Sequence, residues 1–376
     1  MTVPRIPGTG LDRVTRVAFI AACAAIIIAG VRSASSIIAP FLLAAFVAGV
    51  SLPMLDWLRR RGARTAVAIV AVVMLNAAVL AFFGWIVLES FTELRLALPS
   101  YVERWQVLEA TTRTRLVAFG VNPGPDYYAT LAQPGRLLEL ATAAALNVTS
   151  ALSLSLLILL YLVFMLAESV AFPDKWRTVF GEHSQGIGGA ATVLRQVQRY
   201  LVLKTAISLA TGTAIGVGAF LLGVDFALFW GFLAFVLNYI PSIGSFIAAV
   251  PAVLIALLQF GPGRAFGLAS VYLAVNVILG NFADPILVGR QLRLSPIVVL
   301  MSLVFWGWTL GITGLFLAVP LTIALRIVMQ GSATLSRYAA LMGPIDSGPA
   351  LDRVRQWTGQ YSAAGSAPPA RPQPFE

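Results

Sequence analysis

The sequence has few of the residues with which a soluble protein faces water. Only 11% of its 376 residues are charged, whereas 59% are apolar. A typical soluble domain is about 45–50% apolar and about 25% charged. So few charges cannot cover that much apolar surface in water. The composition therefore excludes a soluble globular fold, and it excludes a disordered chain except at the termini.

Metal-binding and nucleophilic residues are almost missing. The single cysteine, Cys23, lies in an apolar run and cannot form an intrachain disulfide. The single histidine, His183, lies in a polar stretch without the companion ligands of a zinc site. The sequence also has no Gly-x-x-x-x-Gly-Lys-Ser/Thr phosphate loop. We therefore expect no cofactor, no metal and no catalytic site, so the protein is predicted not to be an enzyme.

Long apolar runs are the main feature of the sequence. A bilayer core about 30 Å thick needs about 20 apolar helical residues, and eight runs approach or exceed that length. They are Val17–Val31, Ile37–Leu55, Ala66–Leu88, Val148–Ala167, Thr205–Leu222, Phe226–Phe260, Ala265–Asn281 and Ile297–Val328. A cleaved signal peptide is the weaker interpretation of the first run, because Arg32 and a second apolar run follow directly.

Two of these runs are too long to be single spans. As a straight helix, Phe226–Phe260 would reach about 52 Å. Both contain residues that interrupt helices near their middle; these are Pro241 and Gly244 in one run, and Gly307, Gly311, Gly314 and later Pro320 in the other. The sequence therefore predicts an all-α, polytopic membrane protein with about six full spans and two broken helical hairpins.

Positive residues indicate the orientation. The densest cluster comprises Arg59, Arg60, Arg61 and Arg64. Because cytoplasmic loops are rich in Lys and Arg, tracing the spans from this cluster puts both termini in the cytoplasm. It also puts 19 of the 26 positive residues there. The net charge of +10 thus reports topology and not nucleic-acid binding.

The spans divide the chain into five predicted segments. These are an N-terminal three-span segment (1–88), an extracytoplasmic amphipathic segment (89–147), the fourth span with a basic cytoplasmic helix (148–204), a transport core (205–330) and a largely disordered cytoplasmic tail (331–376). Within the core, a span followed by a broken hairpin occurs twice and in opposite directions. That order is the pattern of an inverted-topology repeat.

The outer segment carries an amphipathic pattern of its own. Apolar residues recur at helical spacing from Phe91 to Leu108, with an expected interruption at Pro99. The pattern fits a helix lying on the outer leaflet, and it equally fits a helix packed against neighbouring subunits.

Polar and helix-breaking residues at membrane depth are the candidates for function, because such residues are costly there and broken helices expose backbone groups that lipid cannot satisfy. The candidate pathway residues are Asn238, Pro241, Gly244, Asn276, Asn281, Asp284, Pro285, Arg290, Gly307, Gly311, Gly314 and Pro320. Each break has a plainer interpretation as a turn. The plainer interpretation of Asp284 is a helix cap or a residue of the wet interface beside Arg290.

The same region resembles a known family. Four blocks carry the resemblance: Asn238–Gly244 with Ala249–Pro251, Gly280–Arg290, Leu294–Pro296 and Trp306–Leu321. In this order they resemble the AI-2E family of bacterial membrane proteins, the autoinducer-2 exporter or PerM-like permeases. The resemblance implies the bacterial inner membrane, self-association as a homopentamer and a small polar solute as cargo.

The function expected from the resemblance is export of a small polar, autoinducer-2-like solute by alternating access. The alternatives are a monovalent cation/proton antiporter, a channel and a non-transporting scaffold. The core is poor in acids, with only Asp284 plausibly placed, and this disfavours a dedicated cation antiporter.

Overall fold

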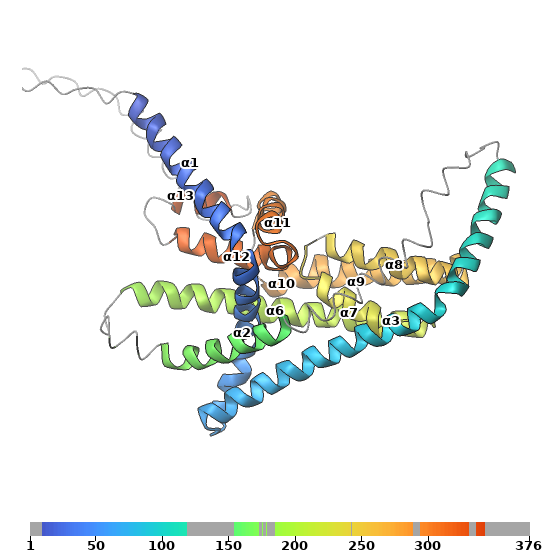
Figure 1. The fold of residues 1–376 in the computed structure, drawn as a ribbon, viewed down its shortest axis with the longest axis horizontal. Coiled ribbons are helices and arrows are strands. Elements are labelled where there is room, and N and C mark those ends of the chain that lie inside the picture. The colour runs from blue at the N-terminus through green and yellow to red at the C-terminus, as the bar shows by residue number, and fades with distance from the viewer. Residues whose placement is uncertain are drawn as a thin grey trace, which may run out of the picture.

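The structure is a computed structural model that describes residues 10–118, 154–172, 185–241, 243–288, 294–330 and 336–342, with Lys175 and Thr178. Every regular element in these ranges is helical (Figure 1). The helices are α1 (Gly10–Ser33), α2 (Ser35–Arg60), α3 (Thr65–Ala118), the helix Leu154–Phe172, α6 (Gln185–Leu221), α7 (Ala227–Leu237), α8 (Ile243–Phe260), α9 (Pro262–Val275), the π-helix η1 (Asn276–Ala283), α10 (Asp284–Val288), α11 (Pro296–Leu310), α12 (Ile312–Gln330) and α13 (Ser336–Leu341).

Seven helices in the described ranges are long and apolar enough to cross a bilayer. They are Ser35–Arg60, Thr65–Thr114, Leu154–Phe172, Leu194–Leu221, Ile243–Phe260, Pro262–Ala283 and Ile312–Gln330. The predicted all-α, multi-pass fold is therefore confirmed. The apolar residues of α1 form a shorter helix, Ala18–Ser33, as do α7 and α11, so each hairpin pairs one short arm with one arm of spanning length.

The N-terminal helices pack around a core of their own. Leu55 of α2, Val72 of α3 and Leu162 of the helix Leu154–Phe172 are fully buried together. Beside this core, the Nδ2 of Asn76 donates to Ser51 Oγ at 3.1 Å, which joins α3 to α2. A hydrogen bond between polar side chains of two helices satisfies both groups where no water is available.

Helix α3 is one element of 54 residues, about 81 Å long. The interruption expected at Pro99 is wrong, because α3 continues through it and bends in its second half (Figure 1). A proline removes one backbone hydrogen bond, which bends a helix without having to end it. The predicted boundary at residue 88 also falls inside α3, and residues 119–147 of the outer segment lie outside the described residues.

The apolar face of the outer part of α3 packs on the first hairpin. Phe91, Leu94 and Leu98 line a cavity of about 190 Å³ together with residues of α7 and α8. At its end, the Tyr101 hydroxyl donates to Asp225 Oδ2 at 2.7 Å and accepts from Gln259 Nε2 at 2.9 Å. This face therefore contacts its own chain, and the two arrangements expected from the sequence stay predictions for the rest of the helix surface.

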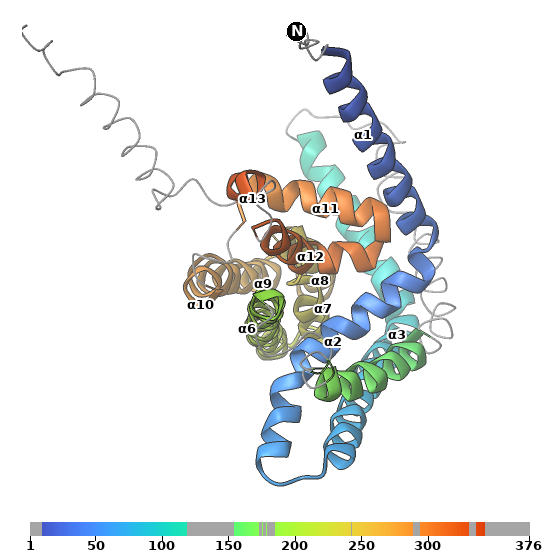
Figure 2. The same cartoon turned by 90° about the vertical axis from the view of Figure 1, so that its left-hand side faces the viewer.

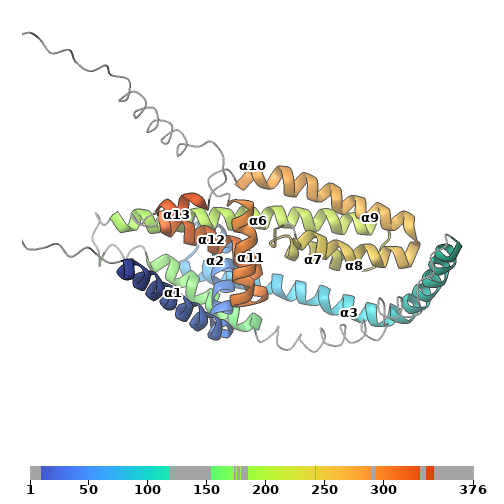
Figure 3. The same cartoon turned by 90° about the horizontal axis from the view of Figure 1, so that it is seen from above.

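Helix α6 and the rod formed by α9, η1 and α10 lie antiparallel. Arg264, near the start of the rod, donates to the carbonyl of Leu222 just after α6. Lys204, early in the span of α6, pairs with Asp284 at the far end of the rod. Figure 3 shows the two elements side by side, and Figure 2 shows both end-on, down their helix axes. The predicted boundary at residue 204 falls inside α6, which is continuous.

Both long apolar runs are broken where the sequence predicted. In the first, α7 ends at Leu237 and α8 begins at Ile243, with Pro241 in the connection. In the second, α11 and α12 are separated only by Gly311, whose φ of 66° is readily adopted by glycine. The two predicted hairpins are therefore present, α7–α8 and α11–α12.

Both hairpins have a closely packed glycine near the start of the second arm. A Cβ on Gly244 would overlap the carbonyl oxygen of Leu237, and a Cβ on Gly314 would overlap that of Trp306. In each hairpin a glycine thus lets the returning arm touch the backbone of the first arm. This shared detail, together with the antiparallel α6 and α9, agrees with the predicted inverted repeat.

We predict that Gly244→Ala and Gly314→Ala each destabilise the protein. Because the added methyl meets backbone rather than a flexible side chain, overpacking should cost about 1–3 kcal/mol. The measurement is the apparent melting temperature in detergent. Gly84→Ala in α3 is the matched control, since a Cβ there meets nothing within 4 Å; equal melting temperatures for all three variants would refute the close approach.

Candidate functional site

A polar stripe lies on the buried face of α6. Lys204, Ser208 and Thr211 follow one another at helical spacing, and all three are buried. Farther along the same face the stripe becomes apolar, with Ile215 and Ala219 fully buried. One half of this face is therefore polar and the other half is apolar.

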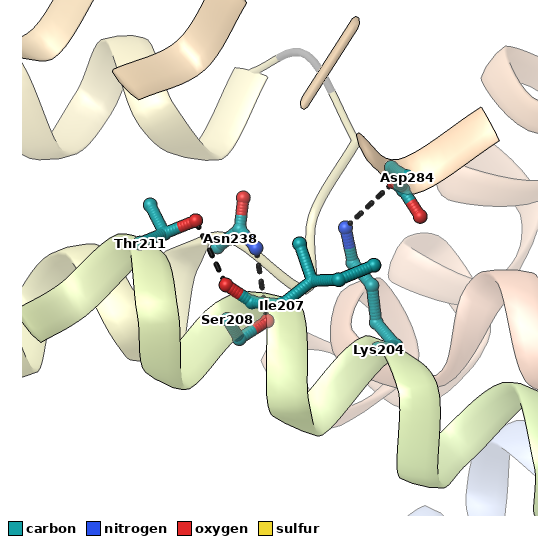
Figure 4. Close-up of polar contacts among 6 residues, drawn as sticks. All are labelled: Lys204, Ile207, Ser208, Thr211, Asn238 and Asp284. Atoms are coloured by element: carbon teal, nitrogen blue, oxygen red, sulfur yellow. Dashed lines mark hydrogen bonds and ion pairs between the residues drawn. The ribbon is translucent and has the colours of Figure 1, made fainter. Parts of the chain in front are cut away.

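The tip of the first hairpin is bonded to this stripe. Asn238, at the end of α7, donates from Nδ2 to Ser208 Oγ at 2.9 Å (Figure 4). The next residue, Tyr239, donates its hydroxyl proton to Thr205 Oγ1 at 2.8 Å. Both contacts come from the turn of α7 where the backbone stops being helical, so they fix the break against α6.

A buried ion pair lies one turn away. Lys204 Nζ is 3.2 Å from Asp284 Oδ2 on the rod (Figure 4). The lysine side chain is 7% exposed and the carboxylate side chain is 28% exposed. Removing two charges from water is costly unless each satisfies the other. The pair is therefore electrically neutral and accessible mainly from the carboxylate side.

The backbone that carries Asp284 is unusual. The eight residues of η1 form a π-helix that ends at this aspartate, and the Asp284 N–H donates to Leu279 O, five residues back. The next residue is Pro285, which has no N–H to donate. π-Helical segments are rare and occur frequently at functional sites.

By helix length, these polar groups fall within the thickness of a bilayer. Lys204 lies about 25 Å along α6 from Leu221, at 1.5 Å per residue. The hydrocarbon core is about 30 Å thick. With the end of α6 at one boundary, Lys204 lies just inside the other boundary and Thr211 near the middle.

A small cavity continues from the stripe toward the rod. Thr211, Ser245 and Asn276 line it together with Tyr272 and three apolar side chains, and its volume is about 10 Å³. This volume is at the lower limit for one water molecule. In this conformation the site is closed.

The second hairpin covers the tip from another side. Ile240 is buried against Leu303 of α11 and Ala318 of α12. The ring of Tyr239 lies 6.3 Å from that of Phe316 and 5.3 Å from that of Phe46 on α2. The break in the first hairpin is thus held between polar contacts to α6 and an apolar wall.

Comparison with known proteins identifies the family. The model of the AI-2E family transporter matches residues 17–333. The chain belongs to the AI-2E transporter family.

Relatives in the family support this assignment. The AI-2 transport protein TqsA of Escherichia coli K12 is 35% identical over 325 residues, which cover 85% of this chain and 93% of TqsA. YhhT of the same strain is 33% identical over 344 residues, 92% of this chain and 97% of YhhT. A Haemophilus influenzae relative is 32% identical over 327 residues, 85% of this chain and 94% of that protein. The names of the latter two proteins refer to transport and state no substrate.

The structure brings only part of the predicted pathway of this transporter together. Asn238 and Asp284 lie on either side of the stripe of α6, and Asn276 lines the small cavity beyond Thr211. Pro241 and Gly244 form the turn between the arms of the first hairpin. Asp284 has Lys204 as its partner; its expected position in the wet interface beside Arg290 stays a prediction, because Arg290 lies outside the described residues.

The remaining candidates lie elsewhere. Gly307 packs against Leu315 within the second hairpin, and Gly314 contacts the backbone of α11. A Cβ on Gly311 would meet nothing within 4 Å. Pro320 lines a separate cavity with residues of α2 and α6. Asn281 is exposed on η1, the side chain of Pro285 is not described, and Arg290 lies outside the described residues.

Sequence reasoning missed Lys204, Ser208 and Thr211. Lys204 ends a run of basic residues and was interpreted as part of a cytoplasmic amphipathic helix. The available signal was the spacing: a lysine followed by Ser at i+4 and Thr at i+7 in an apolar span puts three polar groups on one face. A span with such a face must bury it against protein.

We predict that Ser208→Ala destabilises the protein more than an exposed serine substitution does. The Nδ2 of Asn238 would lose its acceptor in a buried position, which should cost about 1–3 kcal/mol. Thermal unfolding in detergent measures the effect. Ser270→Ala is the control, because its exposed hydroxyl donates only within α9; an equal, small effect for both serines would contradict the buried contact.

Proposed function

We propose that the protein is a secondary transporter that exports a small polar, autoinducer-2-like solute by alternating access. Membership of the family supports transport. The observation that carries the proposal is the convergence of hydroxyl and amide side chains from four elements at membrane depth. Thr211 of α6, Ser245 of α8 and Asn276 of the rod line one small cavity, and about one turn along α6 the Ser208 hydroxyl accepts from Asn238 at the first hairpin tip.

The chemistry of this site fits an uncharged, hydroxyl-rich solute. Hydroxyl and amide groups both donate and accept hydrogen bonds, so they match a small polyol or carbohydrate-like molecule. We propose autoinducer-2 as the specific solute because TqsA, which is 35% identical, is named an AI-2 transport protein.

The ion pair disfavours the cation/proton alternative. A monovalent cation would need net negative charge or several free oxygen ligands. The carboxylate of Asp284 lies 3.2 Å from the Nζ of Lys204, and this ammonium group neutralises it. A cation at this carboxylate would have to displace a buried ammonium group first.

The two hairpins provide the alternating gate. The tip of the first hairpin is held by two side-chain hydrogen bonds to α6 and by apolar contact with the second hairpin. Movement of the tip away from either surface opens the small cavity toward one side. Broken helices build solute sites of this kind in other secondary transporters.

The setting of this transport is proposed on the same grounds. The bacterial relatives and the distribution of Arg and Lys support the inner membrane with both termini in the cytoplasm. Self-association as a homopentamer stays a prediction from the family resemblance.

Flux measurements test the proposal directly. We expect proteoliposomes containing the protein to show saturable flux of autoinducer-2, and Asn238→Ala to reduce it because a buried hydrogen-bonding group is removed from the site. Thr213→Ala, on the exposed face of α6, should leave flux unchanged. Empty liposomes set the background; wild-type flux of autoinducer-2 and of small polyols no greater than that background would refute the proposed function.

A crosslink tests the gate. The protein has one cysteine, so Cys23→Ser provides a cysteine-free background. We expect Ile240→Cys with Ala318→Cys, two buried residues of one apolar cluster, to crosslink and to stop flux until reduced. Each single cysteine is the control. Unchanged flux in the fully crosslinked protein would show that the tip does not move during transport.

A further inference from the structure

We propose that the Lys204–Asp284 pair is a proton-operated lock between α6 and the rod, and that proton binding at Asp284 couples transport to the proton gradient. The inference rests on the proposed function and adds the energy source. It assigns a role to Lys204, which the solute site itself does not require.

The two partners differ in access. The ammonium of Lys204 is almost fully enclosed, whereas more than a quarter of the Asp284 side chain is exposed. The carboxylate is therefore the partner that an approaching proton meets first. The proposal therefore places the proton on Asp284 and not on Lys204.

The pair holds an otherwise loosely packed end of the rod. In the described residues, side-chain hydrogen bonds join α6 and its following turn to the rod only at the two ends, through Lys204 and through Arg264. Between them, η1 has no buried residue. The start of the rod is packed more firmly, since Leu268 and Tyr272 are buried in the core around α8. Breaking the ion pair therefore frees one end of the rod and leaves the other fixed.

The backbone beside Asp284 allows that movement. The π-helix changes its hydrogen-bond pattern at this residue, and Pro285 removes a donor directly after it. Helices bend at such positions. The charge that is released and the point where the rod can bend thus adjoin each other.

Among the residues that the structure describes, few other titratable groups face Asp284. Besides Lys204, α6 contributes Tyr200, which is buried and within electrostatic range of the carboxylate. The hairpin tip contributes Tyr239, whose hydroxyl is hydrogen-bonded to Thr205. The other charged or titratable side chains on elements packed against α6 are Tyr272 and Arg264 on α9, Arg326 on α12, and Asp56, Arg59 and Arg60 on α2.

The proposed step is a simple proton exchange. One proton from the more acidic side binds the Asp284 carboxylate and gives the neutral acid, so the attraction to the ammonium of Lys204 weakens and the end of the rod separates from α6. Release of that proton on the other side restores the carboxylate and the pair. No other reactant is consumed, and one proton crosses per cycle.

Flux with and without a pH gradient tests the coupling. In proteoliposomes, wild-type protein should accumulate autoinducer-2 when a pH gradient is imposed. Asp284→Asn and the neutral double variant Lys204→Gln/Asp284→Asn should lose this accumulation, and their thermal unfolding in detergent, compared with wild type, shows that they are folded. The control is Lys175→Gln/Glu168→Gln, which removes an exposed ion pair and should behave as wild type. Accumulation by the neutral double variant would overturn the proposal.

A measurement without flux separates this inference from the proposed function. Spin labels on cysteines at Leu194 in α6 and Ile286 in α10, both exposed, report the distance between α6 and the end of the rod. We expect the distance distribution to shift on acidification in the Cys23→Ser background. With Asp284→Asn it should be independent of pH and resemble the acidic state. A pH-independent distance in the otherwise wild-type protein would refute the lock, even if autoinducer-2 flux were normal.

Discussion

Within a bilayer, every polar group must find its partner inside the protein, because lipid offers none. This requirement explains the arrangement around α6. Breaking the first hairpin at Pro241 leaves a turn of non-helical backbone at membrane depth, and Asn238 and Tyr239 anchor that turn to hydroxyl groups of α6. The same helix face supplies the ammonium that neutralises Asp284. A single polar stripe therefore supports both the break and the charge.

The glycines have a different task from the polar residues. Gly244 and Gly314 allow the arms of each hairpin to touch, and Gly212, Gly216 and Gly231 allow α6 and α7 to approach backbone to backbone. In a membrane, where helices gain little from excluding water, close packing of this kind is a main source of attraction. The glycines thus determine the shape of the hairpins, and polar side chains of α6 bind the tip of the first hairpin.

The sequence was sufficient for the fold because the features that determine it are local. Run length limits the number of spans, and Pro241 and Gly311 mark where the two long runs turn. The continuity of α3 through Pro99 could not be inferred in the same way. Whether a proline bends a helix or ends it depends on the packing around it, and here Phe91, Leu94 and Tyr101 lie against the first hairpin.

The site was harder to predict because it is made of residues far apart in the chain. Asn238 and Asp284 were recognised as polar groups at depth, but their partners Ser208 and Lys204 lie 30 and 80 positions away. Helical spacing shows which residues share a face, yet not which helix that face meets. Gly307 and Gly311, which were singled out with them, lie within the second hairpin and at its turn, and their part in a pathway stays a prediction.

The change in character along the buried face of α6 has a consequence for protons. Beyond Thr211 that face consists of Ile215 and Ala219, which are sealed among aromatic and aliphatic side chains of α7, α8 and α9. A file of water molecules entering along the polar half would end there, and protons cannot hop through a hydrocarbon plug. Along this face, the described conformation therefore offers protons no continuous polar path from one end of α6 to the other.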